Sequence, residues 1–554
     1  MKELRVFGPP GTGKSTWLAT EAIPKAVDRY GANKIVVTSF TRTAAFEIAS
    51  KPSLKTGEPI RLPQENIGTL HALCFRLLSQ PKLIYKELSK WNETHQIYRI
   101  GSISADMDEG GLVSGMGVED GSRLIMETDK LRNKVIPTAQ WNKEQVDFYN
   151  AWSDFKYANN AMDFLDLIET GIRDLVYGPN QPQMIFVDEA QDFTRLQLKL
   201  IRQWGLQAEW VVLVGDDDQT LYEFTGATPD AFLNPPIEEK NKRVLSQSFR
   251  VPINVHARAT KLIETVSRRE PKAYKPTIVD GHVYQDEVEP DTTFELPDAL
   301  LHDVPKLEGL LSRIKRGQTI MYLASCSYML QPMISLLRSE GILYHNPYRR
   351  TRGDWNPLRQ STKNSVSIKD VLLAYLSVSE TDSPHWHVGE FVKWATFIKC
   401  SDDGMVKKHG RAGIKALVEA IENDVPGLET TRNVAGQILK ETGLNRALAR
   451  DLDWLQENLV RLKQKAIAYP MTIVREHGEN AIRNHPQVIV GTIHSVKGGE
   501  ADAVYLVPDI SRKSASENEN RDSIIRMFYV GMTRTREDLI ILRPATSYYE
   551  DLNP

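Results

Sequence analysis

The 554-residue sequence has few cysteines, no long apolar run and almost no net charge. Its three cysteines, Cys74, Cys326 and Cys400, lie far apart, which argues against a disulfide framework and favours a reducing compartment such as the cytoplasm. No apolar run approaches the roughly 18 residues of a membrane-spanning helix. The first eight residues lack the apolar segment of a signal peptide. We therefore expect a cytoplasmic protein with no membrane partner.

The charge balance also limits the kinds of partner. The chain has 69 basic and 72 acidic residues, for a formal net charge of −3. Any nucleic-acid site must therefore concentrate its positive charge in a local groove. With 41% hydrophobic and 25% charged residues, the composition is that of a globular protein and excludes disorder over most of the chain. At about 100–200 residues per domain, the length predicts three or four domains.

Short β-branched runs alternate with helical patterns along the chain. Such runs are typical of strands that are buried on both faces of a parallel sheet. The first set comprises residues 4–7, 34–38, 184–187 and 210–214, and the second comprises residues 319–323, 487–490, 503–507 and 539–542. The alternation predicts an α/β fold with two parallel-sheet lobes, joined near residues 241–248.

Two segments interrupt this alternation and are interpreted as mostly helical insertions. In the second of them, residues 368–378, 414–421 and 451–467 are predicted helices. The predicted domains are a first lobe (1–79 and 161–243) with insertion 80–160, and a second lobe (244–355 and 487–554) with insertion 356–486.

A complete phosphate-binding loop follows the first predicted strand. Residues 8–15 read Gly-Pro-Pro-Gly-Thr-Gly-Lys-Ser, in the strand–loop–helix context that the P-loop pattern requires. Glycines let backbone N–H groups face phosphates, Lys14 reaches the β- and γ-phosphates, and the Ser15 hydroxyl can bind Mg²⁺. The predicted nucleotide-binding residues here are Gly8, Pro9, Pro10, Gly11, Thr12, Gly13, Lys14, Ser15 and Thr16.

A second apolar strand, residues 184–187, ends in the carboxylates Asp188 and Glu189. Beside a P-loop, this pattern predicts that Asp188 holds Mg²⁺ and that Glu189 is the general base for the attacking water. A nucleotide site alone is compatible with a kinase, a GTPase, a transporter or a motor.

Further motifs separate these possibilities. Residues 185–192 (Ile-Phe-Val-Asp-Glu-Ala-Gln-Asp) and 214–227 (beginning Val-Gly-Asp-Asp-Asp-Gln) resemble motifs II and III of the UvrD/Rep-like superfamily 1A DNA helicases. Other matches occur in the family's order, at residues 38–45, 68–74, 162–167, 245–250, 490–500 and 528–534. The resemblance implies two RecA-like lobes with ATP bound between them.

The resemblance also implies roles for individual residues. Gln219 would contact the γ-phosphate or the attacking water, while Arg250 and Arg534 would act as arginine fingers from the second lobe. Phe249 would lie against the adenine. Gly498 and Glu500 would lie near the nucleotide and couple it to DNA.

The same family motifs imply a track for single-stranded DNA. Aromatic rings stack on any base and therefore grip a strand without reading its sequence. The implied contacts are Phe40, His71, Tyr222 and Phe224, with Thr492 and His494 on the backbone. Packing in the core is the alternative role for Tyr222 and Phe224. Residues 344–352 interleave aromatic and basic side chains and either extend this track or form a solvated basic loop.

The family assignment implies an ATP- and Mg²⁺-dependent motor that moves 3′-to-5′ on single-stranded DNA and acts on 3′-tailed duplexes in repair, recombination or replication. A partner-dependent motor subunit of a nuclease or antiviral complex, a nucleotide-switched DNA clamp and an RNA helicase are the alternatives. A nuclease or a replication factor is a possible protein partner.

Three features depart from the family pattern. Only seven residues precede Gly8, too few for the family's adenine-contacting glutamine motif, and Phe224-Thr225 replace a Trp-Arg pair. Gly499 stands in the place of a leucine, which predicts extra backbone freedom there.

Overall fold

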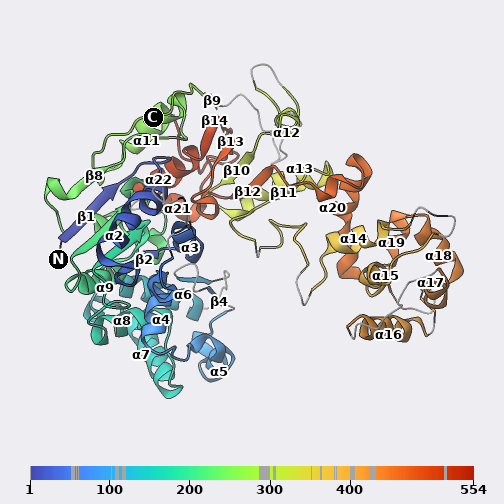
Figure 1. Cartoon of the computed structure of the whole chain (residues 1–554), viewed down its shortest axis with the longest axis horizontal. Helices are drawn as coiled ribbons and strands as arrows, with labels where there is room; N and C mark the ends of the chain where they lie inside the picture. The colour runs from blue at the N-terminus through green and yellow to red at the C-terminus, as the bar shows by residue number, and fades with distance from the viewer. Residues whose placement is uncertain are drawn as a thin grey trace. The chain divides into compact units, whose positions relative to one another are not determined.

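The computed structural model describes residues 2–50, 57, 59, 61–101, 103–106, 111–114, 120–285, 300–303, 307–350, 352–361, 365–379, 381, 384–399, 406–407, 409–422, 432–516 and 521–553. Figure 1 labels its helices and strands. The chain divides into two compact units. The first comprises residues 1–283, 512–538 and 550–554, and the second comprises residues 284–511 and 539–549.

The first unit is built on a six-stranded sheet with the order β3-β2-β6-β7-β1-β8. Every neighbouring pair in it is parallel. Its strands are β1 (Lys2–Phe7), β2 (Ile35–Ser39), β3 (Ile67–Gly68), β6 (Met184–Asp188), β7 (Trp210–Gly215) and β8 (Lys242–Val244). The four strands predicted from the sequence in this region are therefore confirmed as β1, β2, β6 and β7.

Both faces of this sheet are buried, as the apolar runs predicted. Alternate residues of β7 belong to different cores: Val211 and Leu213 pack with α4, α8 and α9, whereas Val212 and Val214 pack with α2. The helices of the lobe are α1 (Lys14–Trp17), α2 (Ile23–Tyr30), α3 (Arg42–Ser50), α4 (Leu70–Leu77), α8 (Phe164–Asp174), α9 (Arg195–Gly205), α10 (Pro229–Leu233), α11 (Ile253–Ile263), α21 (Arg512–Ser516) and α22 (Arg521–Met532). A π-helical turn, Leu18–Ala22, joins α1 to α2.

The first insertion has a small core of its own around Trp91 and Trp152, whose rings meet edge to face with centroids 4.9 Å apart. Its elements are α5 (Leu88–Thr94), the antiparallel pair β4 (Ile103–Asp106) and β5 (Gly111–Ser114), α6 (Asp120–Asn133) and α7 (Lys143–Ala158). It is tied to the lobe by buried ion pairs. Arg132 and Lys156 both contact Asp163, the N-cap of α8, at 2.9 and 2.5 Å.

A second six-stranded sheet has the order β11-β12-β10-β13-β14-β9. Its strands are β9 (His282–Gln285), β10 (Ile320–Ala324), β11 (Tyr344–His345), β12 (Val488–Thr492), β13 (Ala501–Leu506) and β14 (Thr535–Ile541). Strand β10 pairs in parallel with both β12 and β13, and β11 pairs in parallel with β12. The protein is thus an α/β protein with two parallel-sheet, RecA-like lobes, as predicted.

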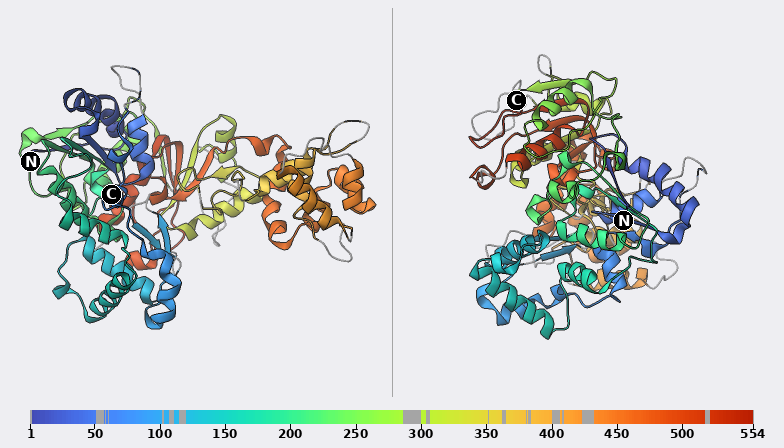
Figure 2. Two further views of the ribbon diagram at one scale, coloured as in Figure 1. Left: turned by 60° about the horizontal axis from the view of Figure 1, so that its bottom comes forward. Right: turned by 90° about the vertical axis from the view of Figure 1, so that its left-hand side faces the viewer.

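The helices of the second unit share one core with this sheet. They are α12 (Leu310–Lys315), α13 (Gln331–Ser339), α14 (Ile368–Leu376), α15 (Val388–Ala395), α16 (Gly410–Glu422), α17 (Arg432–Ile438), α18 (Glu441–Leu448), α19 (Leu452–Asn458) and α20 (Arg461–His477). Helices α14–α20, drawn in yellow to red-orange, gather in one group (Figures 1 and 2), centred on the buried rings of Tyr375, Trp394 and Trp454.

One predicted helix is wrong in extent. Residues 451–467 form two helices, α19 and the start of α20, because the chain turns extended between them. The buried Leu459 bridges Ile398, and the backbone N–H of Val460 donates to the carbonyl of Phe397 at 2.9 Å. Sequence periodicity continues across this break and does not reveal it.

The division into units falls later than the predicted lobe junction. Strand β8 pairs with β1, and α11 packs against α22 of the same unit. The predicted family motifs at residues 245–250 and 528–534 therefore both belong to the first compact unit, and with them Arg250 and Arg534, which were expected to come from the second lobe.

Candidate nucleotide site and aromatic track

The loop between β1 and α1 has the backbone shape of a phosphate cradle. Gly11 and Gly13 both adopt φ of 75°, a left-handed conformation that favours glycine. Gly8 is needed for a different reason. A Cβ atom there would lie 2.3 Å from Cγ of Lys14, so the lysine side chain can fold back along the loop only over a glycine.

Lys14 and Ser15 occupy the positions that the P-loop pattern predicts. Nζ of Lys14 donates to the carbonyl of Gly8 at 2.6 Å, which holds the ammonium group within the loop. Oγ of Ser15 donates to Oδ2 of Asp188 at 3.1 Å. The structure therefore joins the P-loop to the end of β6, as the sequence predicted for a shared Mg²⁺ site.

The Asp188 carboxylate has the features of a metal ligand. It is 1% exposed, and its Oδ1 atom has no hydrogen-bond partner. Burial, reinforced by the charge of Glu189, raises the pKa of Asp188 to about 7, while Lys14 acts in the opposite direction. A divalent cation would satisfy this orphaned oxygen and favour the ionised form. Ser15 and Asp188 thus fit the predicted Mg²⁺ ligands.

Glu189 is positioned by a residue that sequence reasoning left without a role. Nε2 of Gln191 donates to Oε2 of Glu189 at 2.6 Å, and Oε1 of Gln191 accepts from the backbone N–H of Asp216 at 3.0 Å. Gly215 leaves the space for this amide, since a Cβ there would lie 2.4 Å from Oε1. Gln191 therefore connects the ends of β6 and β7. In the sequence, Gly215 is the signal that could have indicated this contact.

Gln219 and Arg534 meet directly, although 314 residues separate them in the sequence. Nε2 of Gln219 donates to Asp216 at 2.8 Å, which turns the amide oxygen toward the arginine. Nη2 of Arg534 donates to that oxygen at 3.2 Å, and its Nε is anchored on the carbonyl of Val530. Arg534 is 2% exposed. Two of the predicted catalytic residues are thus brought together within the first unit.

A buried lysine supports this arrangement and was missed in the sequence. Nζ of Lys272 lies 3.2, 2.7 and 2.8 Å from Asp216, Asp217 and Asp218, and its side chain is 1% exposed. Burial alone would lower the pKa of Lys272, but the three aspartates raise it above its usual value. Arg269 adds two hydrogen bonds to Asp218. No local pattern marks a lysine that is paired only after folding.

The predicted family motif at residues 245–250 lies against the P-loop. The backbone N–H of Phe249 donates to the carbonyl of Gly11 at 2.8 Å, and the hydroxyls of Ser248 and Tyr274 both donate to the carbonyl of Pro10 at 3.0 Å. Arg250 is equally close, since a Cβ on Gly11 would lie 2.7 Å from its Cβ. The Phe249 side chain is 77% exposed.

Three of the predicted DNA-contacting aromatics form a row. The rings of Phe40 and Tyr222 have centroids 4.4 Å apart, and Tyr222 lies 5.9 Å from Phe224. Exposure differs along the row: Phe40 is 8% exposed, whereas Phe224 is 55% exposed. Phe224 is therefore the member most accessible to a base.

His71 lies apart from this row. It is on α4, 2% exposed, with its ring edge-on to Phe164 at 5.8 Å. Burial lowers its pKa to about 4, against the opposing charge of Asp163. Its Nε2 has no hydrogen-bond partner. In this structure His71 is a neutral core residue.

The remaining predicted residues lie at the end of β12 or just after it, in the second unit: Thr492, His494, Gly498 and Glu500. Thr492 accepts a hydrogen bond from the N–H of Ser495, and Gly498 adopts φ of 87°. Gly499 has a different role from the one expected. A Cβ there would lie 2.3 Å from the hydroxyl oxygen of Tyr348, so this glycine makes room for a ring from the predicted basic-aromatic segment.

Two features are absent from the described residues. In that part of the chain, no group of three or more histidine, cysteine or acidic residues is arranged to hold a metal ion. Nor does any helix in the described ranges have the length and apolar character to cross a membrane.

Comparisons with known proteins identify the family. Residues 1–236 match the model of the UvrD/REP helicase N-terminal domain, and residues 487–542 match that of the UvrD-like helicase C-terminal domain. An ATP-dependent DNA helicase PcrA of Staphylococcus aureus is 25% identical over 313 residues, covering 52% of this chain and 42% of the relative. Its counterpart in Staphylococcus epidermidis is 26% identical over 291 residues, covering 49% and 39%. The match therefore spans about two fifths of each relative's length. With matching domains at both ends and the predicted motif residues on the expected strands, the chain belongs to the UvrD/Rep helicase family.

Proposed function

We propose that this protein is an ATP-dependent motor that moves 3′-to-5′ along single-stranded DNA and separates strands or displaces bound proteins in repair, recombination or replication. The observation that carries the proposal is the contact between Gln219 and Arg534. A glutamine that can sense the γ-phosphate and an arginine that can stabilise its transfer are held together, which gives hydrolysis a direct route to conformational change.

The geometry supports a division of work around the phosphates. The backbone of residues 8–13 would cradle the phosphates, and Lys14 would leave the Gly8 carbonyl to bind the β- and γ-phosphates. Glu189, oriented by Gln191, would accept a proton from the attacking water. Arg534 and Arg250 would supply positive charge to the phosphoryl group in the transition state.

Mg²⁺ would be held by Ser15 and Asp188, whose side chains are 3.1 Å apart. When bound, the ion neutralises charge on the β- and γ-phosphates. Phe249 is exposed beside the P-loop and would cover the adenine. Gly498 and Glu500 would couple the nucleotide to the DNA.

The DNA would pass over the row formed by Phe40, Tyr222 and Phe224. Stacking on such rings contributes about 1–3 kcal/mol per base and does not depend on sequence. The row also lies close to the nucleotide site in the sequence, since Gln219 and Tyr222 share one short segment. We therefore expect a movement of Gln219 on hydrolysis to shift the position of Tyr222 as well. Thr492 and His494 would hold the DNA backbone.

The test measures ATP hydrolysis with and without single-stranded DNA, together with unwinding of 3′-tailed and 5′-tailed duplexes. We expect DNA to stimulate hydrolysis and only the 3′-tailed duplex to be unwound. Glu189→Gln is the matched catalytic control, because it should keep ATP binding and abolish turnover.

Other outcomes point to the alternatives. DNA-stimulated hydrolysis without unwinding by the purified chain favours a partner-dependent motor that works with a nuclease or a replication factor. Nucleotide-dependent DNA binding without hydrolysis favours a clamp. Stronger stimulation by RNA than by DNA would contradict the proposed substrate.

A further inference from the structure

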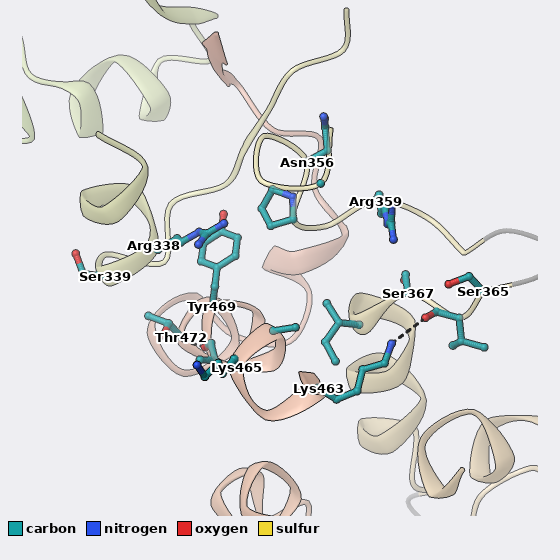
Figure 3. A pocket seen from close by; sticks show the side chains of 16 residues that line it. Arg338, Ser339, Asn356, Arg359, Ser365, Ser367, Lys463, Lys465, Tyr469 and Thr472 are labelled. Atoms are coloured by element: carbon teal, nitrogen blue, oxygen red, sulfur yellow. Dashed lines mark hydrogen bonds between the residues drawn. The ribbon is translucent and has the colours of Figure 1, made fainter. Parts of the chain in front are cut away.

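A basic pocket lies in the second unit, and none of its lining residues has been given a role above. Its cavity volume of about 490 Å³ is within the range of roughly 300–1,000 Å³ typical of small-ligand sites. Its walls come from α13, the segment before α14, and α20 (Figure 3). Four cationic side chains line it: Arg338, Arg359, Lys463 and Lys465.

The charge in this pocket is of one sign. No aspartate or glutamate is among its described lining residues. In the described part of the chain, no carboxylate lies within ion-pair distance of any of the four cations, whereas the buried cations Arg132, Lys156 and Lys272 are paired with acids. Unpaired like charges repel one another, and a bound anion would relieve that repulsion.

Existing contacts hold two of the cations in place. Nε of Arg338 donates to the hydroxyl of Tyr344 at 2.8 Å, which leaves both Nη groups for a ligand. Lys463 extends from α20 toward the segment around Ser367 (Figure 3), where its Nζ reaches the carbonyl of Val366 at 3.4 Å. Burial and the charge of Arg359 both lower the pKa of Lys463. A partly buried ammonium beside a guanidinium is a favourable place for a phosphate oxygen.

The rest of the lining is suited to the same chemistry. The hydroxyls of Ser365 and Ser367 supply neutral hydrogen-bond donors, whereas those of Ser339 and Thr472 already donate to backbone carbonyls of their own helices. Helix α14 begins at the pocket wall, with Ser367 as its N-cap, and its N-terminus adds a partial positive charge. Guanidinium, ammonium and hydroxyl donors around one cavity are the groups that recognise phosphate.

We propose that this pocket binds phosphate groups, either of a DNA backbone or of a free polyphosphate, at a site separate from the P-loop. The DNA source depends on the proposed function, whereas the free ligand does not. A free polyphosphate would lie entirely within the cavity. A DNA strand would place one or two of its phosphates there.

The test compares Arg359→Gln/Lys465→Gln with its parent, both carrying Lys14→Ala to remove nucleotide binding at the P-loop. Both residues are exposed, so the pair of substitutions should leave the thermal unfolding midpoint unchanged. Arg411→Gln/Lys415→Gln is the matched control, because it removes two exposed charges on α16, outside the pocket. Tripolyphosphate binding is measured by calorimetry. Binding of a 3′-tailed duplex is measured by fluorescence anisotropy over a range of salt concentrations.

We expect the pocket variant to weaken at least one probe by about tenfold and the control to weaken neither. Loss of tripolyphosphate binding alone identifies a free ligand. Weaker DNA binding identifies a backbone phosphate as the ligand. In that case the slope of the logarithm of the binding constant against the logarithm of the salt concentration should be smaller in magnitude by about one unit. The proposal is overturned if the pocket variant matches the control with both probes, or if the parent binds neither. Neither measurement uses hydrolysis, so a failure here is distinct from an absence of DNA-stimulated ATPase activity.

Discussion

Arg534 donates a hydrogen bond from its guanidinium to the side-chain oxygen of Gln219 at 3.2 Å, and both side chains are almost completely buried. Each of the two side chains is also held by a second hydrogen bond. The glutamine amide is turned by Asp216, and the arginine is anchored by the carbonyl of Val530. The contact therefore predicts that the two residues act as a unit in ATP hydrolysis.

A double-mutant cycle tests this unit. Arg534→Ala should lower kcat for ATP hydrolysis by about 10³-fold or more while ATP binding is kept, because an arginine finger contributes most in the transition state. Adding Gln219→Ala should reduce kcat by much less than the product of the two single effects. Arg512→Ala, on an exposed helix of the same unit, is the control. Strictly multiplicative effects would show that the contact has no role in turnover.

The ion pairs of Lys272 predict that its substitution lowers the stability of the protein. Lys272→Met should leave three buried aspartates without their shared cation, lowering the free energy of unfolding by about 3–5 kcal/mol. Denaturant unfolding measures this directly. The exposed Lys275→Met is the control, and a loss of less than about 1 kcal/mol for Lys272→Met would mean that the aspartates find another partner.

Substitution of Phe224 distinguishes a role in stacking on DNA from a role in core packing. Because this ring is 55% exposed, Phe224→Ala should weaken binding of single-stranded DNA by about 1–3 kcal/mol without changing the thermal midpoint. Tyr157→Ala, which removes a ring that is 90% exposed elsewhere in the same unit, is the matched control. A fall in the melting temperature with unchanged DNA affinity would assign Phe224 to the core instead.

The parts of the candidate site whose position in the fold could be predicted from the sequence are local ones. The P-loop and the carboxylates at the end of β6 depend on a strand, a turn and a helix start, all of which are contiguous in the chain. Eight of the twelve strands in the two large sheets were predicted for the same reason, since a run buried on both faces is apolar throughout, whereas β3, β8, β9 and β11 were not predicted. Boundaries differ by a few residues at most, except at β14, which begins at Thr535.

The parts that the sequence did not reveal depend on packing between distant segments. Lys272 and Gln191 have roles only because the ends of β6 and β7 and a later loop converge. Gly499 is required by the ring of Tyr348, about 150 residues earlier in the chain. An aromatic residue in a motif likewise does not show whether it is buried: Phe40 and His71 are in the core, whereas Phe224 is exposed.

His71 gives a prediction in which the sign of the pH effect is fixed by its burial. Its pKa falls from 6.5 to about 4 on folding, so between these values the unfolded chain binds a proton that the folded protein excludes. The contribution to stability is complete above about pH 6.5 and is lost as the pH falls toward 4. The substitution His71→Phe removes this pH-dependent contribution, because phenylalanine does not titrate. Between pH 7 and pH 5, the variant should therefore lose about 2 kcal/mol less of its unfolding free energy than the parent.

Denaturant unfolding at several pH values measures this difference, and the exposed His477→Phe is the control. Asp163, the charged group that faces the ring, should stay ionised throughout, because Arg132 and Lys156 keep its pKa low against the effect of burial. It therefore contributes equally to both curves. Parallel curves for parent and variant would show that water reaches His71. A loss of DNA-stimulated hydrolysis in His71→Phe would then favour the DNA contact that the family resemblance implies over a core role.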